Sequence, residues 1–244
     1  MRGIFIVLLL HFSSTITAQR QFYISSSGND SSEGTMLHPF RTIGKLNGLQ
    51  FQPGDRILFK GGATYKGELI LNENDSSDPH NPITIGSYGQ SNASILAGKG
   101  NAILISNLNG IVIKNLNVSS DDPLNNGYGV KVSNALPGNK MLENVRIHHV
   151  TASNFKWAGI FVGGIPTDLP KVQAIAGARY GFKDILIDSC EAHNNMYYGI
   201  YISGSWTPDT RDYANERVVL RDCITYDNTG DSTYTTNHSG SGIL

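Results

Sequence analysis

Hydrophobic positions recur in an eleven-residue block that occurs four times in the second half of the chain. The blocks span residues 110–120, 144–154, 184–194 and 217–227, with offsets of 34, 40 and 33 residues. Positions two and four of every block are Ile, Val or Leu, and position five is always polar. This alternation is the period of a β-strand that buries one face. Each block therefore predicts a short, half-buried strand of the same kind.

The alternation breaks after position four, and the next apolar column lies at position seven. This break predicts a corner followed by another short strand. A shorter Gly-Ile/Val unit is interleaved at residues 129–132, 159–162, 199–202 and 242–244. Repeats of this length are typical of solenoids or of arrays of blades. Because the chain shows one-way corners and few hairpin signals, we favour an all-β parallel β-helix over a β-propeller.

In a parallel β-helix, equivalent residues of successive coils stack at about 4.7–4.9 Å. Ile147, Ile187 and Leu220 are then expected to form one interior file, in which each side chain contributes about 1.5–3 kcal/mol. Cys190 and Cys223 share an inward column, and we favour buried apolar fillers over a disulfide because stacked side chains point in parallel. The position-eleven column, with amide neighbours, is interpreted as a structural ladder. Its members are Asn154, Asn194 and Asp227, beside Asn195 and Asn228.

Composition narrows the class of protein. The chain has 244 residues, 16% of them charged, and a net charge of −1. It lacks the basic excess of a nucleic-acid-binding protein. Residues 1–18 combine Arg2, the apolar run 4–10 and Ala18, which predicts a signal peptide cleaved after Ala18. The run is shorter than the roughly 20 residues of a membrane span, so we expect no membrane span. The expected protein is secreted or extracytoplasmic, and we expect it to be a monomer.

The chain divides into three expected regions. Residues 1–18 form the signal peptide, residues 19–100 an N-terminal cap with the first coils, and residues 101–244 the β-helix repeats. Weak helical spacing at residues 38–49 indicates a short helix that plugs the first coil. Since residues 242–244 open another strand unit, and a solenoid needs a terminal cap, we expect the repeats to be truncated at the C-terminus.

The N-terminal third carries motifs that resemble a known family. They are Tyr23-Ile-Ser-x-x-Gly-Asn-Asp, Pro39-Phe-Arg-Thr-Ile, Pro53-Gly-Asp-Arg-Ile-Leu-Phe, Gly61-Gly-x-Thr-Tyr and Pro82-Ile-Thr-Ile-x-x-Tyr-Gly. Their order is similar to the N-terminal portion of secreted right-handed parallel β-helix proteins of the pectate-lyase-like superfamily. The resemblance implies the fold and leaves the activity open, because one fold hosts many functions. It also implies Ca²⁺ as a candidate cofactor.

The family's hydrolase pattern is mostly absent. Polygalacturonase-like hydrolases carry Asn-Thr-Asp, Asp-Asp and Gly-His-Gly elements on successive coils. Only the pair Asp121-Asp122 is present here, so that class is disfavoured.

Candidate substrate-binding residues lie beside long insertions. The insertions at residues 133–141, 163–181 and 204–216 follow the short strand, and loops on a rigid scaffold commonly carry binding residues. Aromatic residues gather there and suit an extended sugar chain, although the loops can equally bury them as a secondary core. The candidates are Trp157, Phe161, Tyr198, Tyr201 and Trp206.

Candidate catalytic residues occupy the outward column at position five and its neighbour. A lyase that acts on a uronic-acid polymer must neutralise a carboxylate and remove the adjacent proton, for which acids with Lys, Arg or His are suited. Alternating signs are equally what a solvated strand face shows. The candidates are His148, Asp188, Arg221 and Asp222; a metal site is not specified by the sequence.

The leading hypothesis is an exported β-helix protein that binds a polysaccharide and degrades it as a lyase. One alternative is a non-catalytic surface, adhesion or carbohydrate-binding module. Another is a glycoside hydrolase whose catalytic residues lie beyond residue 244.

Overall fold

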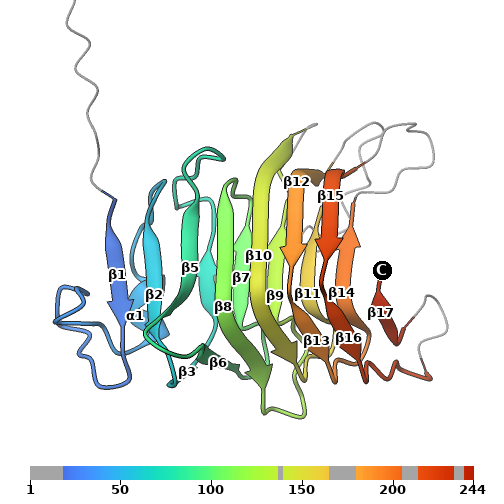
Figure 1. Ribbon diagram of the computed structural model, residues 1–244, viewed down its shortest axis with the longest axis horizontal. Coiled ribbons are helices and arrows are strands. Elements are labelled where there is room, and N and C mark those ends of the chain that lie inside the picture. The colour runs from blue at the N-terminus through green and yellow to red at the C-terminus, as the bar shows by residue number, and fades with distance from the viewer. Residues whose placement is uncertain (1–18, 137–139, 165–179, 205–213, 234–238) are drawn as a thin grey trace, which may run out of the picture.

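The computed structural model describes residues 19–136, 140–164, 180–204, 214–233 and 239–244, and it forms a parallel β-helix. The coils lie side by side along one axis, from β1 at the N-terminal end to β17 at the C-terminal end (Figure 1). An 11-stranded sheet and a 6-stranded sheet enclose the interior, and every strand pair is parallel. The expected fold class is confirmed.

The larger sheet follows the order β1-β2-β5-β8-β10-β12-β15, with four short strands beside it. Its members are β1 (Gln21–Ile24), β2 (Arg56–Lys60), β3 (Thr64–Lys66), β5 (Ile83–Tyr88), β6 (Ala93–Ala97), β8 (Ile111–Ser120), β10 (Met141–Ser153), β12 (Gly181–Asp188), β13 (Glu191–His193), β15 (Glu216–Arg221) and β16 (Ile224–Tyr226). The smaller sheet consists of β4 (Leu69–Leu71), β7 (Ile103–Ser106), β9 (Val130–Ser133), β11 (Ala158–Gly163), β14 (Tyr198–Ser203) and β17 (Ser241–Ile243).

The interior is built from vertical files of equivalent residues. Ile147 pairs with Ile187, and Ile187 pairs with Leu220, so the predicted file is confirmed. Ile113 and Ile85 extend the same file toward the N-terminus. Its members from Ile85 to Ile187 are fully buried. Burial of such residues in every coil supplies the cohesion of the solenoid.

Each block turns at residues in the left-handed region of backbone conformation. Position six has φ between 51° and 55° at Asn115, His149, Ser189 and Asp222. Position eleven has φ of 65°, 54° and 51° at Asn154, Asn194 and Asp227. Asn and Asp adopt this conformation more readily than most residues. The break between positions four and seven is therefore the predicted corner.

The N-terminal coil is covered by a short helix, α1 (Ile43–Asn47), which lies beside β4. Ile43 and Leu46 point into the interior and are buried. Thr42 caps the helix by accepting a hydrogen bond from the Lys45 amide at 3.2 Å, and Asp30 accepts one from the Thr42 hydroxyl at 2.7 Å. The expected helix is present, and it occupies five residues of the predicted segment.

The two cysteines are free thiols in neighbouring coils, as the apolar-filler interpretation expected. The Cys190 thiol donates to the carbonyl of Asp188 at 3.3 Å. Burial raises the pKa of Cys190 to about 12, so the thiol stays protonated.

The predicted signal peptide, residues 1–18, lies outside the described residues and stays a prediction. In the part of the chain that is described, no helix is both long and apolar enough to cross a bilayer.

Candidate functional site

The predicted catalytic column forms one file on the outer face of the larger sheet. Lys114 pairs in register with His148, His148 with Asp188, and Asp188 with Arg221. The alternation of inward and outward side chains along β8, β10, β12 and β15 places all four outside the interior. Three of the four predicted catalytic residues are therefore brought together.

Asp188 is the centre of that group. The Arg221 guanidinium donates to both of its carboxylate oxygens, at 2.9 Å from Nε and 3.2 Å from Nη2. His148 Nδ1 lies 3.4 Å from Asp188 Oδ2, and the Ser189 hydroxyl donates to Oδ1 at 3.3 Å. These contacts, the Arg221 pair above all, lower the pKa of Asp188 to about 2. A carboxylate engaged in this way is a poor proton acceptor and has little capacity left for a cation.

Asp222 lies beside this group at a corner of the coil. Its φ of 54° assigns it the same turn position as Asn115, His149 and Ser189, and its side chain is exposed. The arrangement is the one expected of paired charges on a solvated strand face.

The predicted aromatic binding residues form a packed cluster. The rings of Phe161 and Tyr201 are 5.3 Å apart, and those of Tyr198 and Tyr201 are 4.6 Å apart. Phe161 is 1% exposed and Tyr198 is 5% exposed. Both rings are therefore covered, so the secondary-core interpretation describes these two better than an open platform. Trp206 lies outside the described residues.

Trp157 lies in a stack that crosses three coils. Its ring is 4.8 Å from that of Tyr197, at an interplanar angle of 20°, and 6.4 Å from that of Tyr128, at 17°. Because the two neighbours belong to the coils on either side, both faces of the indole have an aromatic partner. Trp157 is partly exposed, and it therefore presents its edge, not a free face, to a ligand.

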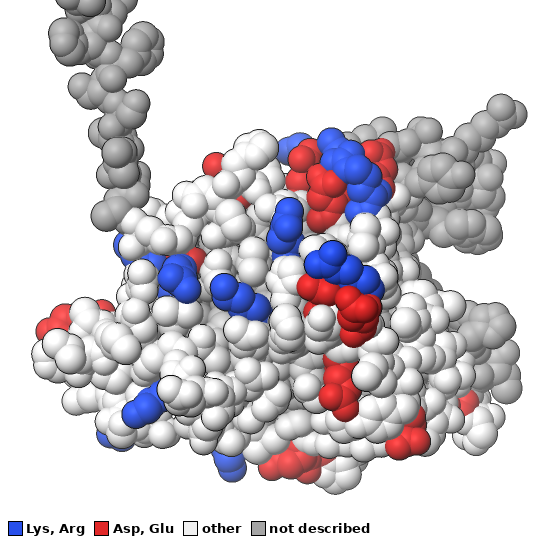
Figure 2. All heavy atoms as spheres, viewed as in Figure 1, with Lys and Arg blue, Asp and Glu red and all other residues white. Residues whose placement is uncertain are grey.

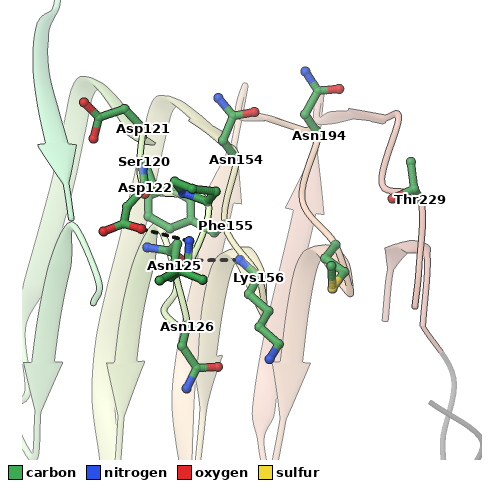
Figure 3. Close-up of a pocket in the computed structure, with 13 residues that line it drawn as sticks. Ser120, Asp121, Asp122, Asn125, Asn126, Asn154, Phe155, Lys156, Asn194 and Thr229 are labelled. Carbon is green, nitrogen blue, oxygen red and sulfur yellow. Dashed lines mark hydrogen bonds between the residues drawn. The ribbon is translucent and has the colours of Figure 1, made fainter. Parts of the chain in front are cut away.

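A cavity of about 590 Å³ lies at the position-eleven corner, which we call the corner groove. Successive coils contribute equivalent residues to it, so it runs along the axis of the solenoid. Asp121, Asn154 and Asn194 lie in a row at one edge, and Asn126 and Lys156 lie toward the other (Figure 3). Its lining is Ser120, Asp121, Asp122, Pro123, Leu124, Asn125, Asn126, Asn154, Phe155, Lys156, Asn194, Met196 and Thr229.

Buried amides hold the walls of the corner groove. Asn125 donates to the carbonyls of Gly98 and Gly100 at 2.7 and 2.8 Å and accepts from the Lys156 amide at 3.3 Å. It thereby fixes the segment 120–126 against two coils. Two coils further on, Asn195 accepts from the Phe155 amide at 3.1 Å. Asn195, one of the predicted structural amides, is therefore part of the groove's scaffold, whereas Asn154 and Asn194 line the groove.

The side chains left for a ligand are polar and of mixed charge. Asp121 and Asp122 lie at one end, whereas Lys156 comes from the next coil with its ammonium 5.9 Å from the Trp157 ring centre. Beyond it, the Tyr197 hydroxyl donates to Asp231 at 2.7 Å. Carboxylates, amides and an ammonium beside an aromatic edge are suited to the hydroxyl groups of sugars.

Sequence reasoning did not identify the corner groove. In the sequence, Asp121 and Asp122 stand out only as an isolated Asp-Asp pair, and Asn126 and Lys156 belong to no motif. The signal in the sequence is the longer, Asp- and Asn-rich segment after the first block, where the second and third blocks turn directly into the next strand.

Calcium was the cofactor that the family resemblance implied. Among the described residues, no group of three or more His, Cys, Asp or Glu side chains is placed to hold a metal ion. The carboxylate of Asp188 is already engaged by Arg221. The described residues therefore do not fit a calcium site of that kind.

No family model and no curated protein matches this chain. Among solved structures, it is similar to the GH136 lacto-N-biosidase from Eubacterium ramulus, with 18% identity and a TM-score of 0.63 for the native protein. The selenomethionine derivative gives 17% and 0.64. These matches cover 84% and 85% of this chain and 41% of the enzyme, so the chain spans less than half of that protein's length. A rhamnogalacturonan lyase matches with 11% identity and a TM-score of 0.45, over 91% of this chain and 65% of the lyase. The likeness to the lacto-N-biosidase confirms that the chain has the fold of the β-helix proteins.

Proposed function

We propose that this protein binds a polysaccharide and that the corner groove holds a segment of it. The observation that carries the proposal is the groove's construction. Successive coils place Asp121, Asn154 and Asn194 in a row, so polar side chains repeat along the axis at the spacing of the strands. A polymer of sugars presents hydroxyl groups at regular intervals along its length. Such a ligand suits a repeating groove better than a compact metabolite does.

The similarity of the fold to a glycan-acting enzyme is consistent with the proposal but does not carry it. The similar structure is named as a lacto-N-biosidase, and its likeness extends to the fold alone. Export of the chain, which the N-terminal segment predicts, is consistent with an extracellular glycan ligand. Because the groove carries both carboxylates and an ammonium group, the proposed partner is a neutral or weakly charged glycan.

Binding can be tested with a panel of neutral and acidic oligosaccharides, measured by calorimetry or by NMR titration. Lys156→Ala and Asn126→Ala remove two donors from the groove without touching the interior. We expect each to weaken binding of the best ligand by about fivefold to tenfold, the usual loss for one polar contact. Lys66→Ala and Asn74→Ala remove the same residue types at exposed positions outside the groove, and we expect no change. Equal affinity for all four variants would refute the assignment of the groove.

Degradation of the bound polymer is a second candidate, favoured by the two carboxylates at the end of the corner groove. Glycoside hydrolysis uses a pair of carboxyl groups, and a lyase uses a base with a neutralising cation. Incubation with the best-bound polymer, followed by analysis for reducing ends and for unsaturated products, tests both reactions. Asp122→Asn should abolish product formation if the groove is catalytic. The position-five candidates are tested in parallel with Asp188→Asn. Saturable binding with no product would support the non-catalytic, carbohydrate-binding alternative.

A further inference from the structure

A second cavity lies on the outer face of the larger sheet at its N-terminal end. It has a volume of about 580 Å³ and lies over β1, β2 and β5. We call it the basic cavity. Its lining is Gln21, Tyr23, Met36, Arg56, Leu58, Lys60, Gly61, Tyr88, Gly89, Gln90 and Ser91. It contains two cations and no carboxylate.

The strand register explains why these side chains converge. Gln21 pairs with Arg56, Tyr23 with Leu58, and Lys60 with Tyr88, so all of them project from the same outer face. Leu58 forms the floor and is only 4% exposed. The rings of Tyr23 and Tyr88 meet edge to face at 5.1 Å and form an aromatic wall.

The cations of the basic cavity have no acidic partner among the residues that the structure describes. Within the described residues, no carboxylate forms an ion pair with Arg56, Lys60 or Lys114. Figure 2 shows blue side chains over β1, β2, β5 and β8 with few red ones among them. The charge of this face is therefore available to a ligand.

Lys114 extends the same charge from the neighbouring strand. It pairs in register with Gly86, which in turn pairs with Leu58 at the floor of the cavity. A Cβ on Gly86 would lie 3.1 Å from Lys114 Cγ and 2.8 Å from the Lys114 carbonyl oxygen. The missing side chain of Gly86 thus leaves room for the Lys114 stem to lean toward the cavity.

We infer that the basic cavity binds an anionic sugar, a ring that carries a sulfate or a carboxylate group. The guanidinium and ammonium groups recognise the anion, because charge-assisted hydrogen bonds are the strong ones. The aromatic wall and Leu58 contact the sugar ring, and Gln21, Gln90 and Ser91 offer partners for its hydroxyl groups. The site is separate from the corner groove and does not depend on the function proposed for it.

Three polymers test the inference. Dextran sulfate carries sulfate groups, polygalacturonate carries carboxylates, and neutral dextran carries neither. The comparison therefore separates recognition of each anionic group from recognition of the sugar chain itself. We expect the protein to bind one or both anionic polymers in affinity electrophoresis, with binding that weakens as salt is added. Neutral dextran should not compete. Equal retention of all three polymers would overturn the inference.

The double variant Arg56→Ala, Lys60→Ala is expected to lose about tenfold in affinity for the anionic polymer. Lys66→Ala, one exposed cation on β3 outside the cavity, should lose less than twofold. Thermal unfolding of each variant checks that the fold is retained, and Tyr88→Phe supplies a milder change of the same wall. Unchanged binding by the folded double variant, or an equal loss in Lys66→Ala, would refute the site.

The two proposals fail separately. Lys156→Ala in the corner groove should leave binding of dextran sulfate unchanged. The double variant of the basic cavity should leave binding of the corner-groove ligand unchanged.

Discussion

The two ends of the larger sheet present different chemistry on the same outer face. Over β2, β5 and β8 the outward cations Arg56, Lys60 and Lys114 form no ion pair with a described carboxylate. Over β12 and β15 the cations are paired, Arg221 with Asp188 and Arg217 with Asp184. Both ends consist of parallel strands stacked in register, with alternating inward and outward side chains. The difference shows that a regular scaffold leaves its outward residues free to serve either solvation or binding.

The largest effect is expected for the interior that both ends share. Ile147→Ala removes a buried side chain between Ile113 and Ile187 and should cost about 2–5 kcal/mol in the free energy of unfolding. Leu220→Ala affects the same file at a half-buried position and should cost clearly less. Urea denaturation measures both variants. Equal costs would mean that the file does not become more exposed toward the C-terminal end.

A smaller loss is expected from Asn195, a buried amide of the C-terminal coils. Asn195→Ala leaves the Phe155 amide without its acceptor and removes the contact with Asn228, which lies at 3.1 Å. Unsatisfied buried groups cost about 1–3 kcal/mol. Asn228→Ala removes a similar amide at a less buried position and serves as the matched comparison. A loss in Asn228→Ala as large as that in Asn195→Ala would contradict the role of burial.

The paired end should also respond to acid. Asp188 has a pKa of about 2 in the folded protein, below its ordinary value of 3.8, because Arg221 and His148 stabilise the charged form. Its contribution to stability is therefore complete above pH 3.8 and is lost as the pH falls toward 2.

Asp188→Asn should flatten the fall of the urea midpoint over this pH window, and Arg221→Ala should flatten it in the same sense. Lys66→Ala should leave the slope as it is in the native protein. A native slope in Asp188→Asn would show that the ion pair does not form in solution.

The smallest effect on stability is expected when an unpaired cation at the N-terminal end of the sheet is given an acidic neighbour. Thr84 lies next to Arg56 in the sheet register, so Thr84→Glu places a carboxylate beside the guanidinium. An exposed pair changes stability by about 0–1 kcal/mol. Affinity for dextran sulfate should nevertheless fall, whereas the uncharged Thr84→Gln should preserve it. Equal affinity of the two variants for dextran sulfate would contradict the idea that the unpaired cations of the N-terminal end bind the anion.

The interior was predictable because it depends on short-range periodicity. Ile, Val or Leu at positions two and four, followed by the break before position seven, predicts the strands, the corners and the interior file of Ile147, Ile187 and Leu220. Stacked coils then force equivalent residues together. The position-five group could be placed in the same way, and the structure brings Asp188, His148 and Arg221 into contact.

The ligand-facing surfaces were not predictable from the same pattern. The corner groove depends on how Asn125 fixes the segment 120–126 against two coils. The aromatic residues were found, but the sequence does not show which ring faces are covered, and Tyr197 covers the face of Trp157. The basic cavity depends on which cations lack an acid nearby, which is a property of side-chain directions.

By itself, the sequence determined the repeat, its corners and its buried files, because each rests on residue type at a fixed spacing along one strand. Only the tertiary structure decided which outward side chains are paired, stacked or open to a ligand. Those contacts join coils 30 or more residues apart, as Arg221 and Asp188 do across 33 residues. They depend on side-chain rotamers and on the paths of loops, neither of which produces a periodic pattern in the sequence.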